Sequence, residues 1–340
     1  MSCKLALLRL KITHFIHTTS NWDKIDRFVK SVKEMPSFDD AIIGREISNH
    51  PKSFDVVGDI ALLHSLPKDC SESELKQIGE SVLKRNKALK VCAVRTKSLN
   101  GNQRAPGQAG IRIIAGVNRS PLITTHNEYG IKCVIDVENT FFSPRMGPER
   151  VRICQQVARG ERVCVLFSGC GMDALQVAGR TEAKEVISIE LNPDAVLCAR
   201  RGQRMLVRNR SVKCDGASER LLIMEGDVLS ILKNFENQYF DRILAPRPKE
   251  GKRDGDLGKD FSGIEYLEAL LRVLKSKGGE CHWYDFAAYH ELPECTRTIK
   301  TISKACLDAN VDFEVIHIAK VGSVAMKQYR VCVDFRLIEK

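Results

Sequence analysis

The sequence lacks the cysteine pattern of a zinc site or of a disulfide framework. Its 13 cysteines are odd in number, lie scattered along the 340 residues, and include no Cys-x-x-Cys pair. Zinc ribbons and small disulfide-bonded domains both need cysteines paired at short spacing. We therefore expect reduced thiols in an intracellular protein, and no bound metal.

Long apolar runs are also missing, which argues against a membrane-spanning helix. No acidic residue occurs in the first 22 positions, which hold Lys4, Arg9 and Lys11. Such a start fits either an organelle-import signal or the first strand or helix of a small folded unit. We expect a cytoplasmic protein, with a mitochondrial or nuclear pool as the alternative.

Positive charge is in excess. The formal net charge is +10, from 53 basic and 43 acidic residues. This excess is typical of proteins that bind a polyanion, although a solubilising surface gives the same number. The tract RRGQRMLVRNR, residues 200–210, has arginines at helical spacing. It is either a solvated helix face or a surface for nucleic-acid phosphates.

Three segments follow one another along the chain. Residues 1–50 form a short basic segment. Residues 51–140 contain the strand pair FDVVGDIALL and a helix that opens with a capping pattern at SESE, and they indicate a small α/β domain. From residue 141 to 340, strands and helices alternate, which predicts a mostly parallel sheet with helices on both faces. The last two strands, FEVIHIAKV and YRVCVDFRL, have no helix between them and should form an antiparallel pair at the sheet edge.

A glycine turn, FSGCG, follows the first strand of this alternation. Ligands of doubly wound sheets bind beyond the carboxyl ends of the strands, so Phe167, Gly169 and Gly171 are candidate cofactor-binding residues. Glycines there would let the backbone approach a ligand closely. The turn has no third glycine of the dinucleotide fingerprint, which favours S-adenosylmethionine over NAD.

Acidic residues end the next two strands. Glu190 stands where an acid commonly binds the ribose hydroxyls, and Asp227 is placed to reach an adenine edge. The alternative is that the two acids only cap the helices that follow them.

The stretch FFSPRMGPER, residues 141–150, is more specific than the features described so far. Together with GIKCVIDV, FSGCG, ELNPDA, ITTHNEYGI and the ending RVCVDFRL, this stretch resembles the archaeal and eukaryotic tRNA (guanine-37-N1)-methyltransferases. The likeness covers about residues 54–337. It implies a Rossmann-like class I methyltransferase sheet with a smaller N-terminal α/β RNA-binding domain. It further implies S-adenosylmethionine as cofactor and the tRNA anticodon loop as partner. A related branch transfers an aminocarboxypropyl group in wyosine synthesis.

The resemblance also implies residue roles. Glu149 of SPRMGPER corresponds to the general base, which removes the N1 proton of guanine so that N1 can attack the methyl group. Asn192 shapes the cofactor pocket. Arg104 matches the arginine that assists the guanine, and either Arg104 or Arg145 could stabilise the negative charge that develops on O6. Arg145 could equally bind a phosphate.

Several positions depart from the family pattern or have competing roles. Pro246, counted with the cofactor-binding residues, stands where an asparagine is usual, and Arg247 replaces a leucine. Val165 lies in the strand where an acid is usual. Arg150 could bind surface phosphates or pair with Glu149. The aromatic pair Trp283 and Tyr284 could stack on the target base, although a core role is expected for at least one.

Three functions remain open at this point. The first is methylation of guanosine N1 at tRNA position 37, and the second is aminocarboxypropyl transfer from the same cofactor. The third is RNA binding without catalysis, because the usual acid and asparagine are missing. We expect a monomer that binds tRNA without a membrane or a metal.

Overall fold

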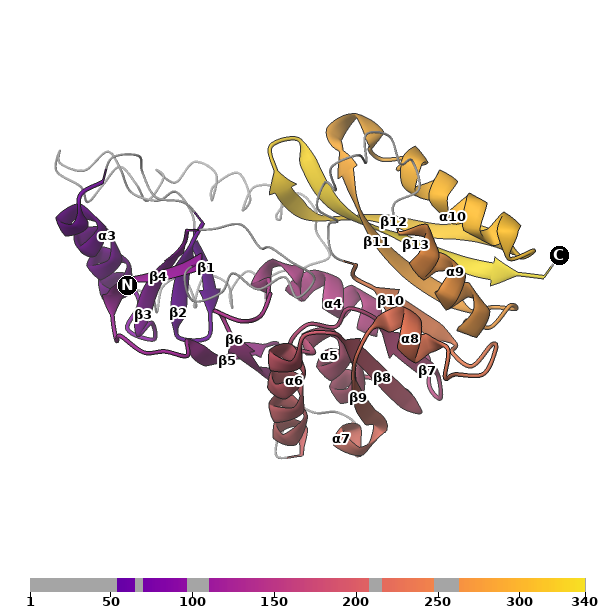
Figure 1. Ribbon diagram of the computed structural model, residues 1–340, viewed down its shortest axis with the longest axis horizontal. Coiled ribbons are helices and arrows are strands. Elements are labelled where there is room, and N and C mark those ends of the chain that lie inside the picture. Colours follow the sequence, from indigo (N-terminus) through magenta and orange to yellow (C-terminus); the bar gives the residue numbers. More distant parts are fainter. Residues whose placement is uncertain (1–53, 65–69, 97–109, 208–215, 248–262, 340) are drawn as a thin grey trace, which may run out of the picture. The chain divides into compact units, whose positions relative to one another are not determined.

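The larger of two main sheets has seven strands and forms the frame of the molecule (Figure 1). The computed structural model describes residues 54–64, 70–96, 110–207, 216–247 and 263–339, all within one unit, Pro51–Lys340. The proposed segment 1–50 and Arg104 lie outside these residues. In spatial order the strands are β12 (Asp312–Ala325), β13 (Gln328–Ile338), β11 (Glu280–Ala288), β10 (Arg242–Ala245), β7 (Arg162–Val165), β8 (Glu185–Glu190) and β9 (Leu221–Glu225).

Strand directions follow the predicted pattern. The pairs β11–β10, β10–β7, β7–β8 and β8–β9 are parallel, and β13 is antiparallel to both β11 and β12. The antiparallel pair at the sheet edge is therefore confirmed. The last strand inserts between β11 and β12, which makes β12 the edge strand.

Helices cover both faces of this sheet because side chains alternate along each buried strand. Val163 and Val165 of β7 belong to one hydrophobic cluster, and Cys164 and Leu166 belong to the other. The first cluster includes residues of α4 (Gly147–Cys154), α5 (Met172–Arg180), α6 (Pro193–Leu206) and α7 (Ala217–Arg220). The second includes residues of α8 (Val228–Leu232), α9 (Ile264–Val273) and α10 (Thr296–Asp308).

The second sheet has four strands in the order β1 (Phe54–Val57), β2 (Ile60–Leu63), β3 (Val91–Arg95) and β4 (Ile111–Gly116). Helix α3 (Glu72–Arg85) packs on it and begins with the predicted capping box, in which Ser71 and Glu74 bond to each other's backbone amides. The strand pair predicted in FDVVGDIALL is confirmed as β1 and β2, with its turn at Gly58 and Asp59.

A separate hairpin consists of β5 (Ile123–Glu128) and β6 (Ile131–Asp136). Strand β6 packs on α5 and α6 of the larger sheet. A Cβ added at Gly179 of α5 would stand 2.8 Å from the Ile131 side chain, so this helix and the hairpin are closely packed. The division of the chain at residue 140 remains a prediction.

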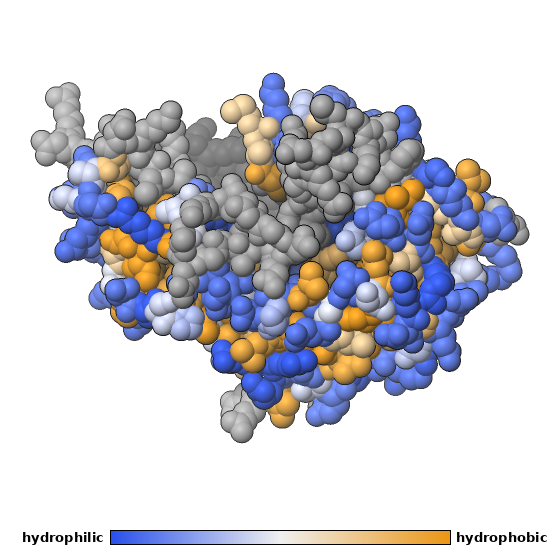
Figure 2. Space-filling model, viewed as in Figure 1, coloured by the Kyte–Doolittle hydropathy of each residue, from blue (hydrophilic) through white to orange (hydrophobic). Residues whose placement is uncertain are grey.

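The cysteines within the described ranges are free thiols, and most are buried. Among the helices in those ranges, none combines the length and apolar character that a bilayer crossing requires. On the visible face, hydrophobic residues form small areas between hydrophilic ones (Figure 2).

Candidate active site

The turn after β7 has an unusual backbone. Phe167, Gly169 and Gly171 have φ values of +51°, +56° and +83°, and Gly171 is the N-terminal cap of α5. The left-handed region is costly for residues with a Cβ, and glycine occupies two of these three positions. The Phe167 ring packs edge-on against Tyr266, with centroids 5.0 Å apart.

The two glycines serve different purposes. A Cβ at Gly171 would stand 2.7 Å from the Cβ of Ala199, so this glycine allows α5 and α6 to pack closely. At Gly169 the nearest atom to an added Cβ is the Phe141 carbonyl oxygen, at 3.4 Å. Close approach of a ligand to the backbone is therefore best supported at Gly169.

Glu190 joins this turn to the end of β8. Its Oε2 accepts a hydrogen bond from the Gly169 amide at 2.7 Å, and its Oε1 accepts one from the Asn192 amide at 2.8 Å. Burial raises the pKa of the Glu190 carboxyl, and the backbone hydrogen bonds oppose the shift. Glu190 thus fixes the turn and stands at the strand end where the ribose-binding role was expected.

Of the two acids weighed as helix caps, Asp227 caps α8, whereas the cap of α6 is Asn192 and not Glu190. Asn192 caps α6, because its Oδ1 accepts from the Asp194 amide at 3.0 Å. Its Nδ2 donates to the Asn139 carbonyl at 2.7 Å, and the residue is buried. Asp227 caps α8 by accepting from the Ser230 amide at 3.0 Å. Asp227 remains exposed at the end of β9, so a second role in ligand binding stays a prediction.

Glu149 lies in the first turn of α4 and is buried, with 7% of its surface exposed. Arg152 donates to both oxygens, from Nε to Oε2 at 2.8 Å and from Nη2 to Oε1 at 2.7 Å. The Tyr284 hydroxyl donates to Oε1 at 2.9 Å. Three donors from two side chains therefore hold this carboxylate in one orientation.

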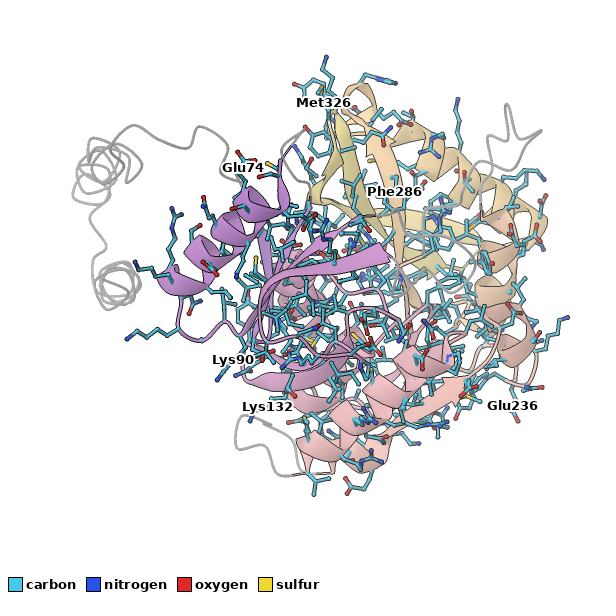
Figure 3. All side chains as sticks on the ribbon, turned by 60° about the vertical axis from the view of Figure 1, so that its left-hand side comes forward. Glu74, Lys90, Lys132, Glu236, Phe286 and Met326 are labelled. Atoms are coloured by element: carbon cyan, nitrogen blue, oxygen red, sulfur yellow. The ribbon has the colours of Figure 1, made fainter. Side chains whose placement is uncertain are left out.

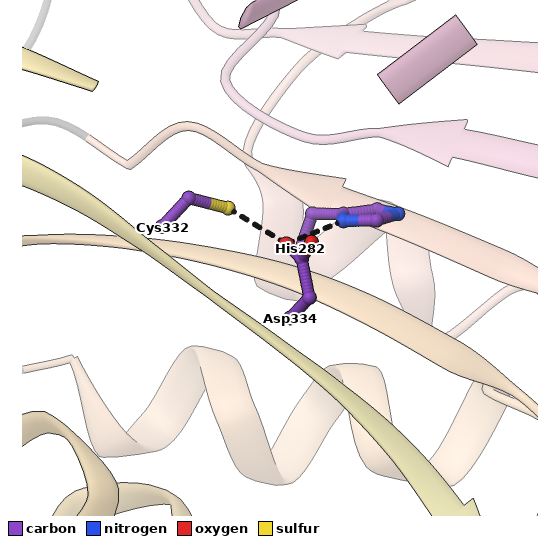
Figure 4. A group of neighbouring side chains, drawn as sticks. All are labelled: His282, Cys332 and Asp334. Atoms are coloured by element: carbon purple, nitrogen blue, oxygen red, sulfur yellow. Dashed lines mark hydrogen bonds and ion pairs between the residues drawn. The ribbon is translucent and has the colours of Figure 1, made fainter. Parts of the chain in front are cut away.

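Arg152 also contacts a second carboxylate. It donates to both oxygens of Asp334, which is buried in β13. His282 Nδ1 lies 2.7 Å from Asp334 Oδ1 (Figure 4). Burial would raise the pKa of the Asp334 carboxyl, but the hydrogen bonds from His282 and Arg152 hold it well below its ordinary value. One guanidinium thus connects Glu149 to a buried group on the sheet.

His282, Cys332 and Asp334 are the group of potential metal ligands found within the described ranges. His282 Nε2 lies 2.8 Å from Arg242 Nη1, which can only donate, so the other ring nitrogen donates to Asp334. The Cys332 thiol donates to Asp334 at 3.1 Å, and burial raises its pKa well above the ordinary value. The guanidinium groups of Arg152 and Arg242 contact Asp334 and His282, and the potential ligands already bond to one another. The cluster therefore does not fit a cation.

Arg145 and Arg150 pair with residues other than Glu149, and Arg104 lies outside the described residues. Arg145 is exposed, and it donates to Asp55 at 2.8 Å and lies 3.0 Å from His64 Nε2. The surface role weighed for Arg150 is wrong, because Arg150 is buried and pairs with Glu128 and Asp173. The pairing of Arg150 with Glu149 is also wrong, since Arg152 makes that ion pair.

The core role expected for at least one of Trp283 and Tyr284 is confirmed, and the alternative of stacking on the target base is not supported. Both side chains are fully buried in the sheet. Tyr284 instead acts through its hydroxyl on Glu149. Pro246 follows β10, as expected, and its carbonyl accepts a hydrogen bond from Arg330 at 3.0 Å.

The sequence interpretation missed Arg152 and Asp334. Arg152 follows Glu149 by three residues on a helix, a spacing that brings opposite charges together, so it could have been found. Asp334 is 182 residues from Arg152 in the chain, and only the sheet brings the two together.

Comparison with known proteins agrees with this geometry. The family model described as the TRM5/TYW2 methyltransferase domain matches residues 124–316. The chain is 25% identical to the tRNA (guanine(37)-N(1))-methyltransferase Trm5b of Pyrococcus abyssi, over 84% of this chain and 75% of the relative. It is 31% identical to the tRNA(Phe) (4-demethylwyosine(37)-C(7)) aminocarboxypropyltransferase of Pyrococcus horikoshii, over 85% of this chain and 90% of the relative.

The fold is similar as well. The crystal structure of Trm5b from Pyrococcus abyssi superimposes with a TM-score of 0.67 and 24% identity, covering 85% of this chain and 76% of that one. The family match spans the glycine turn, Glu149 and the strand ends described above. The chain belongs to the TRM5/TYW2 methyltransferase family.

Proposed function

We propose that this protein transfers the methyl group of S-adenosylmethionine to N1 of guanosine at position 37 of tRNA. The observation that carries the proposal is the buried carboxylate of Glu149, held by Arg152 and Tyr284, in a chain of the TRM5/TYW2 family. A relative with the same named activity matches most of the chain.

The cofactor fits the edge formed by the strand ends. The backbone at Gly169 has space that a Cβ would fill, which suits close approach by a nucleoside. Glu190 and Asp227 stand at the ends of β8 and β9, where ribose and adenine would lie, and Phe167 flanks the turn. S-adenosylmethionine supplies an electrophilic methyl group on a positively charged sulfur.

Glu149 then serves as the proton acceptor. Its Oε1 already accepts from Arg152 and Tyr284, whereas its Oε2 accepts only from Arg152 among the described residues. Oε2 therefore has a lone pair available for the N1 proton of guanine. As that N–H bond breaks, the N1 electron pair forms the bond to the methyl carbon, and the carbon–sulfur pair returns to sulfur.

The tRNA would be held by cations outside this site. Arg200 and Arg204 are exposed on α6, four residues apart and on one face of the helix. They belong to the predicted basic tract, whose last residues lie outside the described part of the chain. The target base must leave the anticodon-loop stack to reach Glu149. We further propose a cytoplasmic location, in line with the free thiols, and a monomeric state.

The test uses the full chain and two tRNAs, a transcript with guanosine at position 37 and a tRNA that carries 4-demethylwyosine there, the base named for the aminocarboxypropyltransferase relative. Two samples of S-adenosylmethionine are compared, one labelled in the methyl group and one in the carboxyl carbon. Methyl label in 1-methylguanosine supports the proposal. The 31% identity to an aminocarboxypropyltransferase makes that reaction the second candidate, and it would transfer the carboxyl label instead. Binding of tRNA without transfer of either label would indicate a non-catalytic protein.

Glu149→Gln tests the proton acceptor. The amide keeps the size of the side chain but cannot take the N1 proton. We expect single-turnover methylation to fall by about a hundred- to ten-thousand-fold, with S-adenosylmethionine affinity retained. A Gln variant with the wild-type rate would remove Glu149 from the mechanism.

A further inference from the structure

A surface cavity of about 670 Å³ lies between the turn that joins β1 to β2 and the strand β5. Val56, Gly58 and Asp59 line one side of it, and residues 123–127 of β5 line another. These β5 residues begin the tract ITTHNEYGI, which the proposed reaction does not use. The volume falls within the range of small-molecule sites, about 300 to 1,000 Å³.

His126 offers this cavity one donor in a fixed orientation. Its Nδ1 accepts a hydrogen bond from the Gly58 amide at 3.1 Å. Burial and the charge of Arg150 lower the pKa of the imidazole, so the ring is neutral near pH 7 and its proton is on Nε2. Within the described ranges this Nε2–H has no hydrogen-bond partner, and it is not enclosed in the interior. A ligand in the cavity can therefore accept from it.

The other polar groups leave the cavity without net charge. Arg119 donates from both Nη atoms to the two oxygens of Asp59, at 2.6 and 3.0 Å, so the charges of this pair cancel. Asp59 also accepts from the Thr124 hydroxyl at 2.7 Å. Asn127 accepts from the Gly130 amide through Oδ1 at 3.0 Å, which leaves its NH₂ group as a donor. The cavity thus presents neutral donors rather than a free cation.

Positive charge lies around the cavity instead. Lys87 and Lys90 are close in the chain to Ala88, which lines the cavity. Lys132 stands opposite Asn127 in the hairpin, so the two side chains share a face. The three lysines are exposed and form no ion pair with the described residues. Lys90, from the small sheet, and Lys132, from the hairpin, are labelled in Figure 3.

A neutral interior with a cationic border matches the chemistry of a nucleotide that is not base-paired. An unpaired base presents uncharged acceptor atoms on its edge and apolar faces, and its phosphates stay outside. Val56 and Ile123 supply apolar surface. We propose that this cavity binds one unpaired nucleotide of tRNA, other than the nucleotide that is methylated. The inference rests on the proposed function, since it names a second contact with the same substrate.

The cavity is separate from the catalytic residues, because neither Glu149 nor Gly169 lines it. One segment connects the two places. The His126 ring packs against Phe142, with centroids 5.0 Å apart, and Phe142 belongs to the stretch FFSPRMGPER that contains Glu149. A nucleotide held at His126 would therefore help to fix the position of the tRNA relative to Glu149.

His126→Asn separates the donor from the structural contact. The asparagine Oδ1 can replace Nδ1 as the acceptor for the Gly58 amide, but the Nε2–H is lost. We expect tRNA to bind about two- to tenfold more weakly, as for the loss of one neutral hydrogen bond. The salt dependence of binding should not change, because no charge is removed. His317→Asn is the matched control, since His317 is exposed on β12 and does not line the cavity.

The border lysines should behave differently. Replacing Lys90 and Lys132 together by glutamine removes charge and leaves the donors of the cavity in place. The slope of log affinity against log salt concentration should then become shallower by about 1 per lost phosphate contact. The thermal midpoint of every variant shows whether it is folded.

A series of tRNA transcripts identifies the nucleotide, and its wild-type arm needs no variant protein. Each transcript lacks the base at one unpaired position other than 37. We expect one position at which removal of the base weakens binding to the wild-type protein. With that transcript, His126→Asn should cause no further loss, because the acceptor of the Nε2–H is already missing.

Binding is measured without S-adenosylmethionine, so the outcome does not depend on methyl transfer. A protein that binds tRNA through His126 but transfers neither label would lose the proposed function and keep this site. The site is overturned if wild type and His126→Asn bind tRNA equally, if no transcript shows the shared loss, or if the wild-type protein does not bind tRNA. Weaker calorimetric binding of nucleoside 5′-monophosphates to His126→Asn, with tRNA affinity unchanged, would assign the cavity to a free nucleotide and overturn the RNA contact.

Discussion

At the scale of single residues, the site depends on side chains that hold one another in position. Glu149 would be poorly placed as a base if its carboxylate could rotate, and Arg152 prevents this by donating to both oxygens. Arg152 is itself fixed by Asp334, which His282 also contacts. A base supported in this way keeps the geometry that proton transfer needs.

Asp334→Asn tests this support. The Asp334 pKa is held below its ordinary value in the folded protein, so its charge favours the folded state above the pKa of an unfolded aspartate, about 3.9. Breaking a buried ion pair costs about 3 to 5 kcal/mol, and we expect that loss near neutral pH. The difference from wild type should shrink as pH falls below about 4, because the unfolded wild-type aspartate then takes up its proton.

Urea unfolding at several pH values measures this difference. Asp308→Asn is the control, because Asp308 is an exposed carboxylate that pairs with Lys304 one helical turn away. Its loss should stay near 0.5 kcal/mol, as for surface pairs in helices. A constant difference between wild type and Asp334→Asn across the pH range would contradict the ion-pair explanation.

At the scale of helices and strands, local signals were sufficient for some features and not for others. The capping box of α3, the turn between β1 and β2 and the antiparallel pair at the sheet edge all follow from residues close in the chain. The function of Gly171 does not, because the obstacle to a side chain there is Ala199 on another helix. Likewise, Arg150 looked like a surface cation until its partners on β5 and α5 were known.

Gly171→Ala tests the packing of α5 on α6. Gly171 and Gly160 have nearly the same φ, +83° and +84°, but an added Cβ at Gly160 meets nothing within 4 Å. Gly160→Ala should therefore show backbone strain alone, about 1 to 2 kcal/mol. Gly171→Ala adds a steric clash, which typically costs a further 1 to 3 kcal/mol or so. Urea unfolding of both variants gives the comparison, and equal losses would mean that the helices adjust without cost.

At the scale of the whole molecule, the excess of positive charge bears on how tRNA is bound. The net charge of +10 does not say where a polyanion binds. The structure adds that Arg200 and Arg204 are exposed on one helix, away from the Glu149 network in the chain. Replacing an arginine that binds phosphates should therefore weaken tRNA binding, whereas replacing an arginine of the active site should slow the reaction of bound tRNA.

Replacing Arg200 and Arg204 together by glutamine should weaken tRNA binding without slowing the reaction of bound tRNA. When a phosphate contact is lost, fewer counterions are released as the tRNA binds. The slope of log affinity against log salt concentration should therefore become shallower by about 1 per contact. Single-turnover rates at saturating tRNA should stay close to wild type, because neither arginine acts on the reacting atoms. Arg159→Gln is the control, since Arg159 is exposed but already paired with Glu182. The tRNA affinity of the Arg159→Gln variant and the salt dependence of that affinity should not change. A double variant with the wild-type salt slope would show that this face of α6 does not contact phosphates. The charge that attracts tRNA would then lie elsewhere on the molecule.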